Sequence, residues 1–287
     1  MITALALMLG LFGQETQPSQ TTQKGNQLVK VELLCDRTAV RPGDTFTLAA
    51  KLTVEKGWHV YWENPGDSGM PTRITIAGPP GFSIGDPQGP APEREEAEGD
   101  IVTFVHKGEV VFLSEVQAPK DVALSKDGAS KATFEVDAHW LVCQETCYPG
   151  GGKARLEVPI AGASRGAPEP APANEKLFAD ARARIPHPWK DLEGATLAWS
   201  GSGASYALRI EVPKATALEL FPITGRSTRV NGTASASSAG MCRLTVDLAY
   251  KEVAPAEPPR LQGVLVVTSD RGKTSYRLDA IRSGTGK

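Results

Sequence analysis

Short stretches of alternating apolar and polar residues run along most of the chain. In residues 45–54 (TFTLAAKLTV) every second residue is apolar and most of the others are polar. A period of two is the pattern of a β-strand with one buried face. Similar segments occur at residues 29–34, 56–62, 73–76, 109–116, 133–140 and 153–160. Gly, Pro and Asp separate these segments, so the first half of the chain predicts an antiparallel β-sandwich of about seven short strands.

A Pro-rich interruption divides the chain. Residues 161–172 (AGASRGAPEPAP) are small or Pro and cannot build a core. Asn174 is placed to cap a short helix through Ala183, which Pro186 and Pro188 would end. Residues 161–188 are therefore expected to be a linker with a short helix.

Alternation returns after the linker and continues to about Ile281. The apolar positions there include Tyr206, Leu208, Ile210, Val212, Leu244, Val246, Leu248 and Tyr250. This block predicts a second, smaller β-sandwich in residues 189–287. A chain of 287 residues suits two domains, since one core typically serves about 100 to 200 residues. The predicted fold is therefore mainly β, with residues 28–160 forming the first domain.

The N-terminus suggests export. Residues 2–12 form an apolar run of signal-peptide length, and a polar tract follows. We expect a signal peptide at residues 1–13 and a disordered polar segment at residues 14–27. No later stretch approaches about 18 apolar residues, so no bilayer insertion of the mature chain is expected. An exported chain meets oxidising conditions, in which disulfides form and persist.

Overall composition offers no alternative partner class. The formal net charge is -2, with 40% hydrophobic and 22% charged residues, as in an ordinary water-soluble protein. Without a basic excess, binding to nucleic acid or to anionic lipid is not expected. Any partner must therefore be recognised by a particular part of the surface rather than by the overall charge of the protein.

The chemistry-bearing feature is a pair of cysteines, Cys143 and Cys147, that directly follows the predicted strand 133–140. A tight turn can bring cysteines four residues apart within disulfide distance. Closing so short a loop is worth only about 2 kcal/mol in the chain-entropy estimate, whereas a bridge from Cys35 to Cys242 would be worth about 5 kcal/mol. The short spacing therefore favours a redox pair over a structural disulfide, and metal binding is a further alternative.

Two segments carry a resemblance to a known family. Residues 57–72 (GWHVYWENPGDSGMPT) and 141–149 (LVCQETCYP) look like the N-terminal periplasmic domain of the DsbD family of thiol:disulfide interchange proteins, including its suppressor-of-copper-sensitivity relatives. The similarity spans about residues 28–160. The first motif is long and specific, whereas a CxxxC motif alone is weak.

The resemblance implies an immunoglobulin-like fold and an exchange role for Cys143 and Cys147. In that family the domain takes electrons from a membrane-embedded thiol reductase and passes them to periplasmic disulfide proteins, without a cofactor. The membrane and thioredoxin-like domains of full-length members have no counterpart in this sequence, so we expect a separate donor protein. An aromatic cap loop shields the cysteines in some members. The corresponding residues here, 92–104 (PEREEAEGDIVTF), are acidic, with Phe104 as their only aromatic.

Other residues are candidates for the surface that a partner protein contacts. Alternation places Trp58, Val60 and Trp62 on the core face of one strand and His59 and Tyr61 on the other. The candidates for the partner surface are His59, Tyr61, Asp67, Phe104, Glu145 and Tyr148. Asp67 also suits a structural turn in residues 64–69 (NPGDSG).

Two alternative functions use the same cysteines. In one, the chain is a copper-tolerance protein that binds Cu(I) through Cys143, Cys147 and an imidazole, His139 or His59. In the other, it is a non-catalytic β-sandwich binding module with a structural disulfide. Cys35 and Cys242 are expected to be buried and unpaired, with a cross-domain bridge as the alternative. The preferred hypothesis is a thiol:disulfide exchange protein, in which Cys147 attacks the disulfide of a partner and Cys143 resolves the mixed disulfide.

Overall fold

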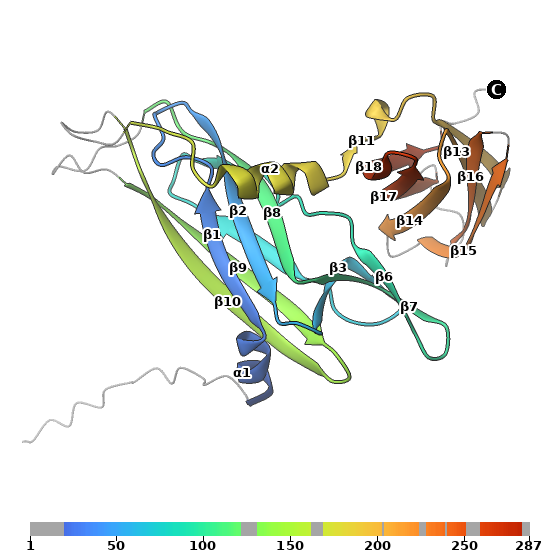
Figure 1. Cartoon of the computed structure of the whole chain (residues 1–287), viewed down its shortest axis with the longest axis horizontal. Coiled ribbons are helices and arrows are strands. Elements are labelled where there is room, and N and C mark those ends of the chain that lie inside the picture. The colour runs from blue at the N-terminus through green and yellow to red at the C-terminus, as the bar shows by residue number, and fades with distance from the viewer. Residues whose placement is uncertain are drawn as a thin grey trace, which may run out of the picture.

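The chain folds into two β-sandwiches that follow one another along the long axis of the molecule (Figure 1). The structure is a computed structural model. It describes residues 20–121, 131–161, 169–202, 204–223, 228–238, 240–250 and 259–282. The predicted signal peptide lies outside these residues. Within them, no helix combines the length and apolar character needed to cross a membrane.

Two sheets form the first sandwich. The strand order of one sheet is β1-β2-β8-β5, and that of the other is β10-β9-β3-β7-β6, with β4 also paired to β9. The strands of the first sheet are β1 (Val29–Cys35), β2 (Thr45–Val54), β8 (Glu109–Gln117) and β5 (Ser83–Ile84). The strands of the second sheet are β3 (His59–Gly66), β4 (Arg73–Ala77), β6 (Glu93–Ala97), β7 (Ile101–Lys107), β9 (Lys131–Cys143) and β10 (Cys147–Pro159). Fully buried Phe46, Leu48 and Phe134 lie in the core between them.

The period-two pattern predicted these strands well. Each of the seven segments picked from alternation overlaps one observed strand, which confirms the mainly β, sandwich-type fold. The three additional strands are β5, β6 and β7, of which β6 and β7 form a hairpin that includes most of the segment compared above with a cap loop. Its first strand reads EREEA and contains no apolar alternation, so the pattern could not reveal it.

A short helix occupies part of the segment that we expected to be disordered. Helix α1 (Gln20–Gln27) covers the second half of residues 14–27 and packs against β10. Trp140 Nε1 donates to the Gly25 carbonyl at 3.2 Å, and the Gly151 amide donates to Asn26 Oδ1 at 2.7 Å. A Cβ at Gly25 would lie 2.2 Å from the Pro149 carbonyl oxygen. Tertiary contacts with the β9–β10 hairpin hold this polar helix, which its composition alone does not favour.

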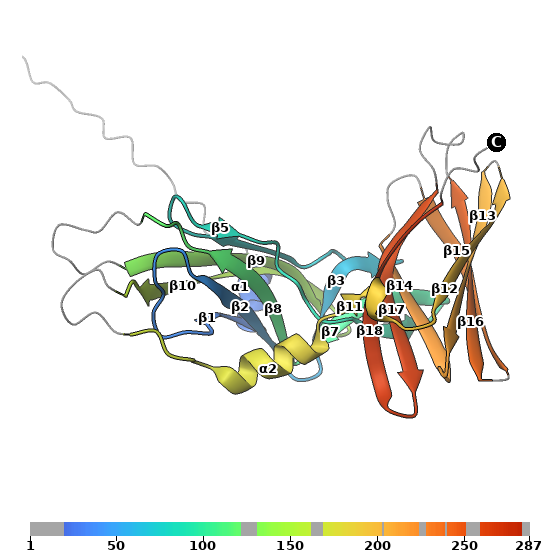
Figure 2. The same ribbon diagram turned by 90° about the horizontal axis from the view of Figure 1, so that it is seen from above.

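The linker contains the predicted helix and packs on the first sandwich. Helix α2 (Glu175–Arg184) buries Phe178 and Ala181 against Ala49 and Leu113 of the first sheet. Asn174 does not cap it, because the residue is left-handed (φ 54°) and its side chain instead donates to the Cys35 carbonyl at 2.9 Å. Figure 2 shows the helix lying along the outer face of the sheet on the way to the second sandwich.

The second sandwich contains two four-stranded sheets, with strand orders β11-β18-β17-β14 and β12-β13-β16-β15. The strands of the first sheet are β11 (His187–Pro188), β14 (Ala217–Ile223), β17 (Arg260–Ser269) and β18 (Gly272–Ile281), and those of the second are β12 (Thr196–Ser202), β13 (Ser205–Pro213), β15 (Thr228–Ser238) and β16 (Met241–Tyr250). A single-turn 3₁₀ helix, η1 (Trp189–Asp191), precedes β12. The core of the second sandwich contains Leu208, Ile210, Leu244 and Val246, which are buried as their alternation predicted.

Candidate redox site

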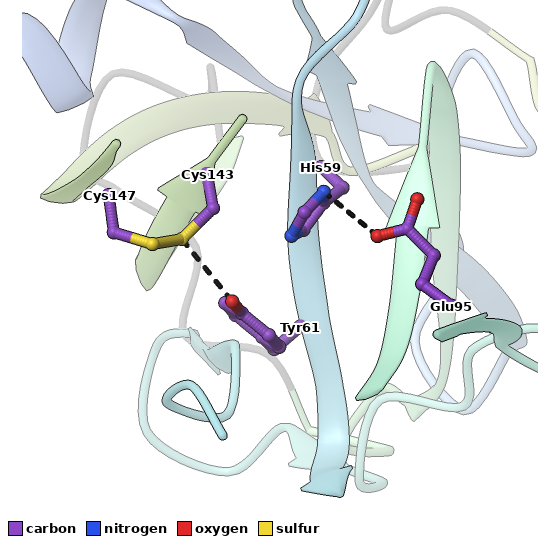
Figure 3. The surroundings of a disulfide bond; sticks show 5 residues. All are labelled: His59, Tyr61, Glu95, Cys143 and Cys147. Carbon is purple, nitrogen blue, oxygen red and sulfur yellow. Dashed lines mark hydrogen bonds and ion pairs between the residues drawn. A yellow bond between two sulfur atoms is a disulfide. The ribbon is translucent and has the colours of Figure 1, made fainter. Parts of the chain in front are cut away.

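The β9–β10 hairpin brings the two cysteines together. Cys143 ends β9, Cys147 begins β10, and the two residues face each other directly in the antiparallel ladder. Their Cα atoms are 4.2 Å apart and their sulfurs form a disulfide (Figure 3). The intervening residues Gln144, Glu145 and Thr146 make the turn, which the Gln144 amide closes by donating to the Thr146 carbonyl at 3.3 Å. The hairpin alone therefore suffices to position both sulfurs.

The two cysteines differ in exposure. Cys143 is 1% exposed and packs with Tyr61, Val105 and Leu141. Cys147 lies on the surface at the tip of the hairpin. A thiol of another protein can thus approach Cys147, whereas the Cys143 sulfur is shielded from one side by the protein.

Tyr61 is the polar group that contacts the disulfide. Its hydroxyl lies 3.3 Å from Cys143 Sγ and is oriented to donate a hydrogen bond (Figure 3). The ring is 5% exposed, and burial, with a smaller contribution from Glu95, raises the pKa of Tyr61. The hydroxyl therefore keeps its proton and remains a donor. The sequence placed Tyr61 on a solvated or partner-binding face; the structure instead buries it against the sulfur.

A tight loop holds the Tyr61 ring from its other side. The Tyr61 carbonyl accepts from the Thr72 amide at 3.2 Å, so the chain returns to Tyr61 after the turn. Gly69 in this loop has φ +100°, and a Cβ there would lie 2.3 Å from Tyr61 Cε1. Only glycine fits this approach, both for its backbone conformation and for the missing side chain.

His59 lies beside Tyr61 on the same strand. Its ring packs edge-on against Tyr61 with centroids 5.3 Å apart, and His59 is the direct ladder partner of Cys143. His59 Nδ1 lies 3.2 Å from the Glu95 carboxylate, whose other oxygen pairs with Lys107 at 2.5 Å. Burial lowers the pKa of His59, although Glu95 opposes the shift. A neutral His59 that donates through Nδ1 to Glu95 leaves its second nitrogen as an acceptor, pointing away from Glu95 in Figure 3.

Three further candidates for the partner surface, Glu145, Tyr148 and Asp67, lie in different surroundings. Glu145 is exposed at the hairpin tip beside Cys147. Tyr148 is half-buried; its ring packs at a tilt against Trp58, with centroids 5.8 Å apart, and its hydroxyl accepts a hydrogen bond from Lys24 at 2.8 Å. Asp67 joins its loop to β7, because its carboxylate accepts from the Val102 amide at 3.0 Å and its own amide donates to the Val102 carbonyl at 2.8 Å.

Phe104 is buried, although the sequence made it a candidate for the partner surface. It is 6% exposed and packs against Trp62 and against Phe221 of the second sandwich. Trp62 is buried, as predicted, but in this cluster between the two domains rather than in the core of the first. Alternation fails here because the ladder between β3 and β7 is irregular after Tyr61.

The structure separates His139 from the cysteines. It lies four residues before Cys143 on β9, about 13 Å along the strand at about 3.3 Å per residue. Its Nε2 pairs with Asp137 Oδ1 at 3.1 Å. In the described part of the chain, no three His, Cys, Asp or Glu side chains are grouped so that they could hold a metal ion. Of the two imidazoles considered for Cu(I), only His59 lies next to the pair.

Cys35 and Cys242 are buried in different sandwiches. The alternative of a bridge between them is therefore wrong. Burial raises the pKa of the Cys35 thiol to about 11, which keeps it protonated and unreactive.

Glu95 is the site residue that sequence reasoning did not single out. It belongs to the acidic segment compared above with a cap loop, where four of six residues from Glu93 to Glu98 are glutamates. The contact with His59 depends on the pairing of β6 with β7 and of β7 with β3, which are distant in sequence. No local spacing signals such a contact.

The fold and the paired cysteines define a β-sandwich domain with a disulfide at a hairpin tip, exposed at Cys147 and buried at Cys143. The sequence profile of a family described as "Thiol:disulfide interchange protein DsbD, N-terminal" matches residues 26–159. Residues 26–159 are therefore a domain of the DsbD N-terminal family, which is a thiol:disulfide interchange domain.

One solved structure extends the similarity of fold over both sandwiches. The crystal structure of the N-terminal periplasmic domain of ScsB from Proteus mirabilis matches with a TM-score of 0.59 at 15% identity, covering 90% of this chain and 96% of that one. A protein of unknown function from Porphyromonas gingivalis W83 reaches a TM-score of only 0.24 at 9% identity, covering 88% and 99%, and supports no argument. No curated protein sequence matches the chain.

Proposed function

We propose that the chain is an extracytoplasmic thiol:disulfide interchange protein that passes two electrons from a dithiol donor to disulfide proteins. The observation that carries the proposal is the unequal exposure of the pair, with Cys147 on the surface and Cys143 1% exposed. An exchange pair needs one sulfur that a partner can reach and a second that can resolve the mixed disulfide. A disulfide that only closed this hairpin would have no need of such an arrangement.

Reduction of the pair begins at Cys147. A donor thiolate attacks Cys147 Sγ, a donor–Cys147 disulfide forms, and the Cys143–Cys147 bond breaks with Cys143 leaving as a thiolate. The donor's second thiolate then attacks the donor sulfur of the mixed disulfide and releases Cys147. The donor is oxidised to a disulfide and this chain is reduced to a dithiol.

Transfer to the acceptor follows the same steps in reverse. The Cys147 thiolate attacks a disulfide of the acceptor, and one acceptor sulfur leaves with the electron pair. Cys143 then attacks Cys147, which restores the disulfide and releases the acceptor as a dithiol. This sulfur chemistry requires no cofactor.

Tyr61 stabilises the charge that develops on Cys143 in both directions. In the first step Cys143 is the leaving group, and the Tyr61 hydroxyl 3.3 Å from its sulfur donates a hydrogen bond to the forming thiolate. Such a donor is most effective in a buried, preorganised position. His59 and Gly69 hold the ring in this position from two sides.

The proposed setting is the periplasm or an equivalent compartment. Residues 2–12 suit a signal peptide, and an oxidising compartment is where a cycling disulfide meets oxidised partners. A membrane-embedded thiol reductase is the proposed donor and periplasmic disulfide proteins are the proposed acceptors, as the family membership suggests.

Single-cysteine variants test the proposal. Reduced Cys143→Ser, which keeps the exposed Cys147, should form a stable mixed disulfide with a disulfide-containing probe such as glutathione disulfide. Cys147→Ser should react much more slowly because the remaining sulfur is buried. Mass spectrometry of the quenched reactions measures both adducts.

The double variant Cys143→Ser/Cys147→Ser is the matched control, since it leaves only buried Cys35 and Cys242. It should form no adduct. If Cys143→Ser forms none either, or if Cys147→Ser reacts as fast, the proposed roles of the two sulfurs are wrong.

A further inference from the structure

The second sandwich contacts the strand that carries Tyr61. Phe221 of β14 packs edge-on against Trp62 at 6.3 Å and against Phe104 at 5.2 Å, and all three rings are buried. Asn64 Nδ2 donates to the Pro222 carbonyl at 2.6 Å, and Arg277 of β18 pairs with Glu63 at 3.6 Å. Figure 1 shows β3, β6 and β7 reaching toward the second sandwich.

These contacts fall where β3 loses its regular pairing. Tyr61 pairs with Val105 and Gly66 pairs with Thr103, so four residues of β3 lie opposite a single residue of β7. Three of the four, Trp62, Glu63 and Asn64, are the residues that contact the second sandwich. The β3–β7 ladder therefore does not fix this segment, and contacts with Phe221, Pro222 and Arg277 do so instead.

Tyr61 immediately precedes the irregular segment. It is the last regularly paired residue of β3 on that side, and its hydroxyl must stay within hydrogen-bond distance of Cys143 Sγ. A shift of about 1 Å would weaken an interaction that depends on both distance and angle. The position of the Trp62–Asn64 segment thus bears directly on the redox site.

We propose that the second sandwich acts as a positioning domain for the redox pair, with Phe221 and the Asn64–Pro222 hydrogen bond holding β3 so that Tyr61 stays on Cys143. The proposal rests on the exchange function proposed above. It assigns Phe221 and Asn64 as positioning residues that act through Tyr61.

The test measures reduction of the Cys143–Cys147 disulfide by dithiothreitol in the full chain. Phe221→Ala should lower both the reduction rate and the equilibrium constant for reduction by about threefold to tenfold, the range that one weakened hydrogen bond covers. In a Tyr61→Phe background, where the hydroxyl is already absent, the same substitution should change either quantity by less than about twofold.

A second variant covers the case in which Phe221→Ala disrupts the second sandwich. Asn64→Asp keeps the oxygen that accepts from the Gly66 amide but replaces the donor to Pro222 with a carboxylate oxygen. It should reproduce the loss of rate and the dependence on Tyr61. Phe178→Ala is the matched control, because it removes an equally buried ring from α2 without touching β3; its rate should equal that of the wild type.

The outcomes separate this proposal from the function on which it rests. If the wild type fails to exchange with thiols, the proposed function is wrong and this proposal is wrong with it. If the wild type exchanges but Phe221→Ala and Asn64→Asp match its rate, only the positioning role is wrong. Equal losses with and without Tyr61, or an equal loss in Phe178→Ala, would also overturn it.

Discussion

Removal of the Tyr61 hydroxyl tests the chemistry of the site most sharply. Tyr61→Phe keeps the buried ring, its contact with His59 and its packing on Gly69. It deletes only the donor that lies 3.3 Å from Cys143 Sγ. The leaving thiolate then forms in a buried position without that hydrogen bond.

The expected magnitude follows from the charge on the sulfur. A hydrogen bond to a charged group contributes about 1.5–3 kcal/mol. Sulfur is a weaker acceptor than oxygen, so we take the lower part of this range, about 1.5–2 kcal/mol. At about 1.36 kcal/mol per tenfold change, the rate of reduction should fall by about 10- to 30-fold.

The assay is reduction by excess dithiothreitol at pH 7, quenched with acid and followed by alkylation with a maleimide that changes the mass of each free thiol. Tyr148→Phe is the matched control, since Tyr148 is the neighbour of Cys147 and its hydroxyl bonds Lys24 rather than sulfur. A Tyr61→Phe rate within twofold of the wild type, or an equal loss in Tyr148→Phe, would refute the role assigned to Tyr61.

Two further substitutions give independent predictions. Gly69→Ala should displace the Tyr61 ring, because the new Cβ would lie 2.3 Å from Cε1, and should slow reduction at least as much as Tyr61→Phe; Gly99→Ala, with a comparable φ of +82° and open space around it, should leave the rate unchanged. Burial lowers the pKa of His106 to about 4, with a smaller contribution from Arg184, against about 6.5 in the unfolded chain. The unfolded state therefore binds the extra proton as the pH falls from about 6.5 to about 4, and the free energy of unfolding should drop by about 2 kcal/mol between pH 7.5 and 5 on this account. Urea unfolding at the two pH values measures this decrease in the free energy of unfolding. In His106→Gln the decrease should be smaller than in the wild type by about 2 kcal/mol. An equal decrease in the two proteins would contradict the pKa assigned to His106.

The sequence predicted the parts of the fold that a local pattern encodes. Alternation located β2, β9 and β13, because in each strand every second residue is buried in a core while most residues of the other face are polar and at least partly exposed. The cysteine spacing indicated that Cys143 and Cys147 can form a disulfide, because a two-stranded hairpin is enough to bring them together.

Features that depend on long-range packing were not predictable in this way. The Tyr61–Cys143 contact joins residues 82 positions apart and needs the pairing of β3 with β9. The acidic segment around Phe104 suggests that this aromatic side chain is exposed. Its burial depends on packing with Phe221 of the second sandwich, which no local pattern indicates. Helix α1 is polar throughout and owes its place to the backbone of the β9–β10 hairpin.

The reduction potential of the Cys143–Cys147 pair tests the central claim most directly. Equilibration of the full chain with glutathione and dithiothreitol buffers, followed by thiol counting, gives this value. An exchange pair should titrate between about -120 and -270 mV, the range of known exchange proteins. A potential below about -300 mV, as structural disulfides show, would contradict the claim and leave the disulfide as a link that only closes the hairpin.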